Sequence, residues 1–443
     1  MVKTYEQLNE KVYSEILPNG LRVIVIPKPG FNKTFVCFAA KYGALVNRFV
    51  PRDGSDYVEM PLGIAHFLEH KMFDLPSGDD ASTLFARYGL DSNAMTNYTM
   101  TAYLFSGAAN ITDGINLLLD FVQDPYFTDE SVKKEQGIIA QELKMYLDDP
   151  NDALHLGLMQ NLFHQYPLRY DVGGTVDSIM KITKEHLYKC YRTFYHPANM
   201  DLIVVGDPDN IFANQNNSVE SVFNHVRKNQ EGKKFPPAID IKKSFYVENE
   251  KAYRGSGLSK MDIMMPKVAV GLKLPYEKYG ENEALATELK LKILIEAVLG
   301  PTSDAFQEML DLELINGNLY YEVYIDGFCG FIKIQANSHK PRQFIVYIKE
   351  KLLALNKITI DAGLFERFKK SVLGSFIKSL NNLDYLGFSY LEYLYKQSDI
   401  FAGIEAFAGL KREELIPMAK YFVPEALSDY VILPKKFSTN YSL

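Results

Sequence analysis

Two histidines four positions apart, His66 and His70, stand in the stretch GIAHFLEHKMF (63–73), and Glu69 directly precedes the second one. On a helix, residues i and i+4 lie on one face, so both imidazole rings can reach a single metal ion, and imidazole is a common zinc ligand. Glu69 falls within the same arc of roughly 100°, because successive helical residues are rotated by about 100°. The spacing therefore predicts half of a zinc site together with its own catalytic base.

A catalytic zinc ion takes three protein ligands and keeps one position open, so a third ligand must come from another segment. The stretch KKEQGIIAQELKMYLDDP (133–150) offers Glu135 and Glu142, which are seven residues apart and therefore share one stripe of a predicted helix. Glu142 stands among apolar residues, and a buried carboxylate is costly unless it is paired or bound to a metal. Both glutamates are candidates for a place in or beside the site.

The histidine motif has a plain alternative, in which two histidines on a surface helix belong to a salt-bridged patch. By chance, H-x-x-E-H would occur on the order of once in a hundred chains of this composition. The other six histidines have no metal-binding spacing and are predicted to be surface groups or hydrogen-bonded core groups; they are at positions 155, 164, 186, 196, 225 and 339.

The length of the chain, 443 residues, exceeds the size at which one hydrophobic core keeps growing, so two domains of about 200 residues each are expected. We predict an N-terminal metal-binding domain over 1–228 and a C-terminal domain over 246–443. The segment between them, 229–245, is polar and contains two consecutive prolines, which is typical of a linker.

Local patterns predict the elements that position the motif. Two β-rich stretches bounded by Asn-Gly and Pro-Gly, 19–28 and 33–43, are expected to form adjacent strands. We predict helices over 63–73, 79–88, 111–125 and 128–150, and one or two strands over 94–107.

The two halves share a pattern, because residues 182–207 and 410–435 each read as a helix, a Phe-Pro break and an apolar strand. A chance match of a common α/β motif is the alternative, but duplication is favoured. The expected fold class is α+β, with two related α/β domains in which helices cover a mixed or antiparallel sheet. H-x-x-E-H occurs in the first half alone, so a related second domain would lack the metal motif.

Composition excludes several classes of function. The net charge of −7 is spread without an acidic tail or a long basic run, which argues against nucleic acid as a partner. The three cysteines, Cys37, Cys190 and Cys329, form no CxxC pair, so neither a disulfide framework nor a thiolate zinc site is indicated. The chain start lacks a signal-peptide pattern and no segment reaches about 18 uninterrupted apolar residues, so we expect a cytoplasmic protein without a membrane span.

Together these motifs resemble the insulinase or pitrilysin family of inverted-motif zinc peptidases, which includes the mitochondrial processing peptidase. The resemblance covers nearly the whole chain, through NGLRVIV, GIAHFLEHKMF, SNAMTNYTMTAYLF, the paired glutamates and HPANMDLIVVGD. It is closest to the short bacterial members, of the processing-peptidase-like, elongation factor P modification-associated or peptide-maturation type. It implies that the two domains form one half of a clamshell, which closes around a chamber with a second subunit.

The resemblance also implies a role for each motif residue. His66, His70 and Glu142 would be the ligands of one Zn²⁺ ion, Glu69 the general base, and Glu135 a carboxylate that orients or screens the site. An extended peptide would add to an edge strand. The residues of that strand would be Asn93, Ala94, Met95 and Thr96, whose alternative role is merely to cover the zinc helix.

One departure from the family pattern concerns the partner chain. Homodimeric members usually carry an arginine in the second half and a tyrosine six residues later, and both contact the substrate carbonyl. Here the arginine position falls near Leu310 and the tyrosine position near Asn316, with Tyr320 and Tyr321 a few residues on. We expect a dimer, and this departure favours a heterodimer in which a metal-free homologous chain supplies the arginine and tyrosine.

The sequence thus predicts a zinc endopeptidase that processes short extended peptides. Two neutral imidazoles and one carboxylate leave a zinc site with net positive charge, which suits hydrolysis. Two alternatives stay open. One is a non-catalytic scaffold subunit of a peptidase-like complex, and the other is a zinc hydrolase of a non-peptide substrate.

Overall fold

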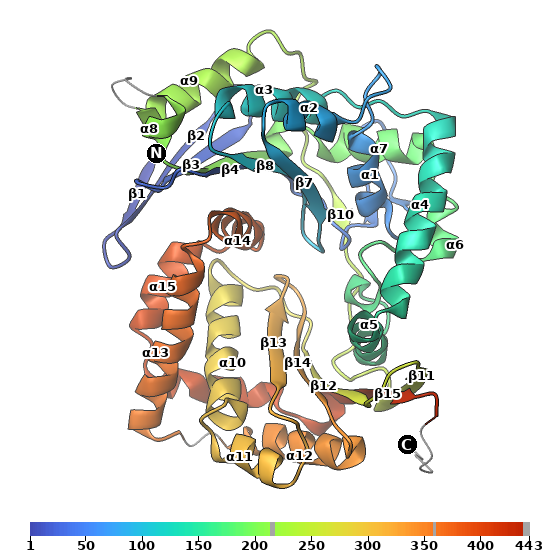
Figure 1. Cartoon of the computed structure of the whole chain (residues 1–443), viewed down its shortest axis with the longest axis vertical. Coiled ribbons are helices and arrows are strands. Elements are labelled where there is room, and N and C mark those ends of the chain that lie inside the picture. Colours follow the sequence, from blue (N-terminus) through green and yellow to red (C-terminus); the bar gives the residue numbers. More distant parts are fainter. Residues whose placement is uncertain (213–217, 358–359, 437–443) are drawn as a thin grey trace.

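The computed structural model describes residues 1–212, 218–357 and 360–436, and it consists of two halves that are each built on a sheet covered by helices (Figure 1). The first sheet has seven strands, in the order β1 (Val2–Tyr5), β2 (Glu10–Ile16), β3 (Arg22–Pro27), β9 (Met200–Gly206), β4 (Thr34–Ala40), β8 (Thr101–Gly107) and β7 (Asp91–Thr96). The second has five strands, in the order β11 (Ser256–Met261), β15 (Leu427–Pro434), β12 (Lys267–Leu274), β14 (Gly330–Asn337) and β13 (Leu319–Ile325). A small sheet of β10 (Lys243–Ser244), β5 (Arg48–Phe49) and β6 (Val58–Glu59) lies where the chain passes between the halves.

The helices of the N-terminal half follow the predicted order. The longer ones are α1 (Ile64–Met72), α2 (Ala81–Arg87), α3 (Ile111–Val122), α4 (Asp129–Asp148), α5 (Pro150–Leu162), α7 (Lys184–Phe194) and α9 (Ser218–Gln230). Those of the C-terminal half are α10 (Glu283–Leu299), α11 (Asp304–Asp311), α12 (Pro341–Ala354), α13 (Ala362–Ser379), α14 (Leu383–Tyr395) and α15 (Ile400–Ala408). The helices and strands predicted between residues 63 and 150 are confirmed, apart from shifts of a few residues at their ends.

The two sheets repeat one topology. In the first, β3 runs parallel to β9, while β4 pairs antiparallel with β9 and β8, and β8 pairs antiparallel with β7. In the second, β11 runs parallel to β15, while β12 pairs antiparallel with β15 and β14, and β14 pairs antiparallel with β13. The predicted fold class, two related α/β units, is therefore confirmed. The boundaries drawn at 228 and 246 stay a prediction.

One local expectation was wrong, and another is met by a different type of helix. The predicted strands 19–28 and 33–43 are not adjacent, because β9 lies between β3 and β4. The six residues that join β3 to β4 are enough to cross two strand spacings of about 4.8 Å each, and the wholly buried β9 fills the interior position. The helix expected near the start of 410–435 is a 3₁₀ helix, Arg412–Tyr421, since Pro417 inside it cannot donate a backbone hydrogen bond.

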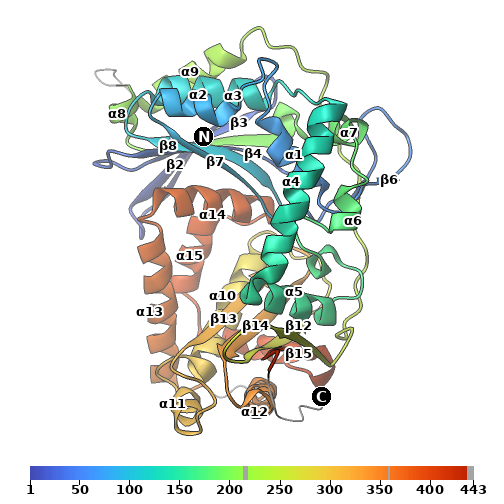
Figure 2. The same ribbon diagram turned by 45° about the vertical axis from the view of Figure 1, so that its right-hand side comes forward.

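Each half lends a helix to the sheet of the other half. Helix α5 packs on β12 and β15, and α14 packs on β4 and β9, so the two sheets are covered on both faces (Figures 1 and 2). Both contacts depend on a glycine. A Cβ atom at Gly157 would lie 2.4 Å from the Tyr430 ring, and one at Gly387 would lie 2.3 Å from the Phe35 ring. The exchange joins the two halves through buried apolar surface.

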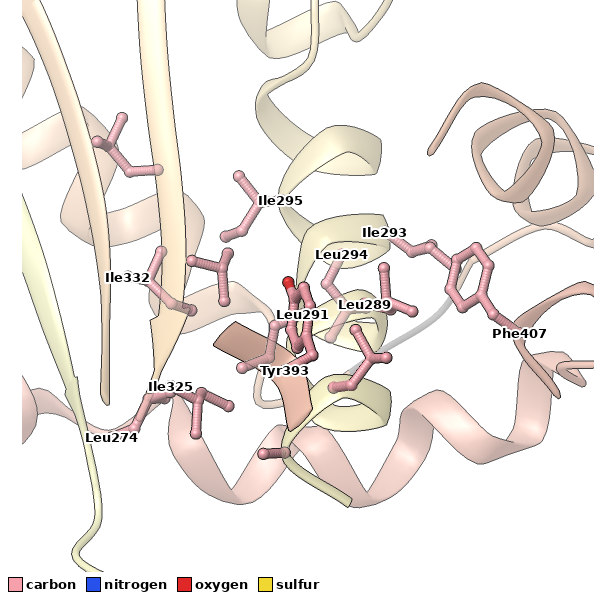
Figure 3. Close-up of a cluster of buried hydrophobic side chains, with 14 of the residues drawn as sticks. Leu274, Leu289, Leu291, Ile293, Leu294, Ile295, Ile325, Ile332, Tyr393 and Phe407 are labelled. Carbon is pink, nitrogen blue, oxygen red and sulfur yellow. The ribbon is translucent and has the colours of Figure 1, made fainter. Parts of the chain in front are cut away.

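The core of the C-terminal half lies between α10 and its sheet (Figure 3). Leu291, Leu294 and Ile295 of α10 are fully buried with Ile325 and Ile332 of the strands. Burial of such a side chain stabilises the fold by about 1.5–3 kcal/mol. This core continues into the face of the first sheet that bears Phe35 and Ile203, so the two halves share it, and it contains no metal ligand.

Two further predictions can be compared with the described residues. Cys37, Cys190 and Cys329 are buried and free, as their spacing indicates. Among the described helices, none combines the length and the apolar character needed to cross a membrane.

Candidate metal centre

Helix α1 carries His66, Glu69 and His70, and the glycine before it fixes where the helix begins. Gly63 has a φ of 84°, in the left-handed region that favours glycine, and a Cβ atom there would lie 2.1 Å from the carbonyl oxygen of Gly173. The loop around Gly173 therefore crosses the start of α1 at a distance that only glycine permits. The apolar side of α1, including Phe67 and Leu68, is buried, so its position is held from both sides.

Helix α4 carries Glu135 and Glu142 beside α1. Its first turn is capped by Thr128, whose Oγ1 accepts a hydrogen bond from the backbone N–H of Ser131 at 3.1 Å. Ile139 and Leu143 are buried on the stripe that also bears the two glutamates. Packing of that stripe therefore aims both carboxylates at α1, with which α4 is in contact.

The structure brings His66, His70 and Glu142 together. One ligand atom from each lies within 4.8 Å of the others. The two Nε2 atoms are 3.2 Å apart, His66 Nε2 is 3.9 Å from Glu142 Oε1, and His70 Nε2 is 3.6 Å from Glu142 Oε2. Residues 66 and 142 are thus on separate helices yet share one small volume.

These separations fit a zinc ion. Tetrahedral ligands about 2.0–2.1 Å from zinc are roughly 3.3 Å from one another, close to the observed separations of the three side chains. Glu142 Oε2 is buried and has no hydrogen-bond partner, and an unsatisfied buried carboxylate oxygen is costly unless a cation completes it. The donor set of two imidazoles and one carboxylate is also typical of catalytic zinc.

Glu135 orients His70 without belonging to the ligand set. His70 donates its Nδ1–H to Glu135 Oε1 at 3.1 Å, which leaves Nε2 free to bind a metal. Burial raises the pKa of Glu135, but the hydrogen bond from His70 and the charge of Lys71 outweigh it, and the pKa lies below its usual range. The nearly buried Lys71 ammonium is 3.7 Å from Glu135 Oε2.

The two histidines differ in electrostatic environment. Burial lowers the pKa of His66 to about 4, and the neighbouring His70 adds to the effect. Burial acts in the same direction on His70, but the surrounding carboxylates raise its pKa above the usual value. His66 is therefore in the neutral form that binds a metal, and a cation at the site would favour the neutral form of His70 as well.

Glu69 is buried next to the ligand set and is held by Thr96 of β7. The Thr96 hydroxyl donates to Glu69 Oε2 at 2.5 Å. Burial raises the pKa of Glu69 to about 7, although the hydrogen bond from Thr96 and the nearby His70 act in the opposite direction. Glu69 is thus a carboxyl group able to exchange a proton near neutral pH, at the edge of the metal centre.

The four residues expected to bind substrate lie on β7, which is the last strand of the seven-stranded sheet and pairs only with β8 among the described residues. Asn93 is exposed, and its side-chain Oδ1 accepts a hydrogen bond from Ala94 N–H at 2.8 Å. Met95 packs toward the core shared with the C-terminal half, whereas Ala94 packs toward the core under α1. Of the four, Thr96 is the residue that hydrogen-bonds to Glu69, beside the candidate ligands.

The family pattern places an arginine and a tyrosine at positions that lie in the second half of this chain, on α11 and in the loop before β13. Leu310 is a half-buried residue of α11, and Asn316 is exposed in the loop before β13. Tyr320 is 53% exposed, while Tyr321 donates its hydroxyl to Glu296 at 2.7 Å.

Two neighbours of the ligands were not predicted. Tyr146, one turn after Glu142, donates its hydroxyl to Glu142 Oε1 at 2.7 Å, and its spacing of four residues could have indicated this contact. Lys71 directly follows His70 in the motif, but nothing in its position along the chain indicates the contact with Glu135, which depends on how α1 and α4 pack.

Two family models match parts of this chain. Residues 54–176, which include every residue of the centre, match the family described as Insulinase (Peptidase family M16). Residues 181–372 match the family described as Peptidase M16 inactive domain. The first match contains all the candidate ligands, and the second contains none of them.

Curated relatives and solved structures resemble the chain over almost its full length. An uncharacterized zinc protease of Bacillus subtilis, YmfH, is 39% identical over 397 residues, which are 90% of each chain. The crystal structure of a putative M16-like peptidase from Alicyclobacillus acidocaldarius has a TM-score of 0.89 and 30% identity, and the match covers 96% of this chain and 99% of that one. Pitrilysin shares the fold, with a TM-score of 0.72 and 14% identity over 98% of this chain and 46% of its own.

Proposed function

The chain belongs to the insulinase family of peptidases, family M16, and from this premise we propose that it is a zinc-dependent endopeptidase acting on short extended peptides. The observation that supports the proposal most is the convergence of His66, His70 and Glu142, with Glu69 on the same helix as the two histidines. Two relatives, from Bacillus subtilis and Helicobacter pylori, are named zinc proteases, which is consistent with the proposal. The ion is proposed to be Zn²⁺, bound by these three side chains.

In this proposal, each residue of the centre has a separate task. Zinc held by the three ligands would supply Lewis acidity for the attack of water on a peptide carbonyl. Glu69 would accept the proton of the attacking water at its carboxylate and return it to the leaving amine, a task suited to its pKa of about 7. Glu135 would keep His70 in the tautomer that leaves Nε2 available.

The peptide would bind as an added strand along β7. This strand has one neighbour in its sheet, so its other edge can offer backbone N–H and C=O groups to an extended chain. Asn93, Ala94, Met95 and Thr96 would line that edge, and the contact of Thr96 with Glu69 would bring the bound peptide next to the base.

We further propose that the site is completed by a second subunit, because the positions expected to hold an arginine and a tyrosine are Leu310 and Asn316. The partner would be a metal-free homologous chain, and the two would enclose a chamber. A cytoplasmic location and the domain boundaries at residues 228 and 246 belong to the same proposal.

The experiment that tests this function is cleavage of a quenched fluorescent peptide library by the zinc-loaded chain, alone and with chains that copurify from the native cell. We expect weak cleavage by the chain alone and strong cleavage after addition of the partner. Full activity of the chain alone would refute the need for a partner. A chain with one zinc ion that cleaves no peptide in either arm would favour the scaffold role or hydrolysis of another kind of substrate.

A further inference from the structure

A second candidate site lies apart from the metal centre, in a cavity of about 240 Å³. Its walls come from the turn after β4, the end of α7 and the segment that leads into β10, which joins the two halves of the chain. Three cationic side chains line it, Lys41, Arg52 and Lys243, together with one carboxylate, Asp240. The cavity therefore has two positive charges in excess, although the whole chain carries a net charge of −7.

None of the three cations forms an ion pair with any residue that the structure describes. Each of the three is half-buried, whereas more deeply buried cations of the chain have carboxylate partners. Lys273 is fully buried and pairs with Glu248 at 2.5 Å, and the nearly buried Lys71 is paired with Asp74. Lys41 lies over the ring of Tyr395 and Lys243 over the ring of Phe194, but neither has an anionic partner. Since even partial burial of a charge without a counterion is unfavourable, three such groups around one cavity indicate a missing anion.

Neutral contacts hold the cations in place. Arg52 donates from Nε to the carbonyl of Arg192 at 2.9 Å and from Nη1 to the carbonyl of Pro237 at 2.7 Å, while Nη2 has no partner. Lys243 Nζ donates to the carbonyl of Lys41 at 3.2 Å and uses one of its three donors. The site therefore keeps unused donors in fixed positions.

Without a bound anion, the positive charges of the lysines in the cavity repel one another. Burial, and to a smaller extent the charge of Lys41, lower the pKa of Lys243 to about 8. Burial also lowers the pKa of Lys41. His196 adds no positive charge, because its Nδ1 accepts a hydrogen bond from Ala198 N–H while Nε2 donates to the carbonyl of Pro236.

We propose that this cavity binds a phosphate group, carried by free inorganic phosphate, by pyrophosphate or by a nucleotide. Phosphate carries about −1.5 to −2 charges near neutral pH, which matches the excess of the lining. The guanidinium of Arg52 presents a planar pair of donors and the two lysines act as compact point charges, a combination suited to phosphate oxygens. This inference is independent of the proposed peptidase activity.

A bound phosphate would connect two parts of the chain. Lys41 and Arg52 belong to the N-terminal half, while Lys243 and Asp240 belong to the segment that leads to the C-terminal half. Binding would therefore stabilise the contact between that segment and the first half. The expected result is a protein that unfolds at higher temperature when phosphate is present.

The experiment is titration of the full-length chain with inorganic phosphate, pyrophosphate and ATP at pH 7 and constant ionic strength, followed by calorimetry and thermal unfolding. We expect at least one of the three to bind, and at ten times its Kd to raise Tm by about 1–3 °C. Binding of ATP alone would assign a nucleotide, and binding of inorganic phosphate or pyrophosphate would assign the free anion.

Lys243→Gln and Lys41→Gln should each weaken this binding at least tenfold. The matched control is Lys242→Gln, which makes the same charge change at the neighbouring exposed residue outside the cavity lining and should bind like the wild type. In phosphate-free buffer the Lys243→Gln protein should have an unchanged or higher Tm, since an unpaired cation is removed, and this shows that the variant is folded. The proposal is overturned if none of the three ligands binds at 10 mM, or if both cavity variants bind as tightly as the control.

Discussion

The two halves of the molecule share one sheet topology but differ in the side chains placed on it. Helix α13 follows β13, β14 and α12 along the chain as α4 follows β7, β8 and α3. Counted from the first residue of each helix, Glu135 and Glu142 of α4 correspond to Phe368 and Ser375 of α13. Helix α10, which packs on the second sheet, contains no histidine. Among the described residues, the His66–His70–Glu142 group is the one set arranged for a metal ion. The same sheet topology therefore occurs twice, and the candidate metal ligands occur in one copy.

One contact is present in both halves. Thr96 of the edge strand β7 donates to Glu69 of α1 at 2.5 Å, and Tyr321 of the edge strand β13 donates to Glu296 of α10 at 2.7 Å. A hydroxyl from an edge strand thus holds a helix carboxylate in each case. Of the two glutamates, Glu69 alone has histidines on its own helix, so the comparison can separate a structural contact from the catalytic one proposed for Glu69.

The largest effect is expected from loss of a zinc ligand. His70→Ala should remove bound zinc and reduce peptide cleavage by about 10³-fold or more, because two remaining ligands cannot hold a catalytic ion. Elemental analysis and a quenched-peptide assay measure the two quantities. His339→Ala changes an exposed histidine of the second half and should affect neither. Stoichiometric zinc in the His70→Ala protein would contradict the ligand assignment.

The second prediction compares the two carboxylates. Glu69→Gln should retain zinc and lower the rate by about 10²–10⁴-fold, since proton transfer is lost while the ligands are intact. Glu296→Gln makes the same change in the second half and should alter the rate by no more than about twofold. Equal rates for the two variants would remove the role assigned to Glu69.

The third prediction concerns the hydroxyl that holds each carboxylate. Thr96→Val should lower the rate by roughly 10-fold, because a hydrogen bond to a charged group contributes about 1.5–3 kcal/mol, and zinc content should not change. Thr96→Ser keeps the hydroxyl and should restore most of the rate. Tyr321→Phe is the counterpart in the second half and should leave the rate unaffected; a comparable loss there would mean that the contact acts through general stability.

The smallest effects test the exchange of helices between the halves. Gly157→Ala and Gly387→Ala place a Cβ atom 2.4 Å and 2.3 Å from aromatic rings, so each should destabilise the fold by about 1–3 kcal/mol in urea unfolding. The controls are Gly137→Ala in α4 and Gly374→Ala in α13, where nothing lies within 4 Å. These should be neutral or stabilising by up to about 1 kcal/mol. If the first pair behaves like the controls, the close packing of α5 and α14 is not essential to the stability of the fold.

The sequence predicted those features that depend on local spacing. The separation of His66 and His70 by four residues and of Glu135 and Glu142 by seven follows from the period of a helix, and the structure places all four around one point. The position of β9 between β3 and β4 could not be predicted, because it depends on pairing between strands about 180 residues apart in the chain.

Local sequence patterns could not predict the contacts between helices and strands either. Thr96 was predicted to contact the substrate, yet its hydroxyl also holds Glu69, which follows only once β7 lies beside α1. The exchange of α5 and α14 depends on Gly157 and Gly387 meeting aromatic rings of the opposite half. Such contacts need tertiary structure, which periodicity does not specify.

The most direct test of the central claim is anomalous diffraction at the zinc absorption edge from crystals of the zinc-loaded chain. We predict one strong peak per chain, bounded by His66 Nε2, His70 Nε2 and the carboxylate of Glu142. A chain that carries stoichiometric zinc in solution but shows no peak at this position, or shows it elsewhere, would contradict the assignment of these three residues.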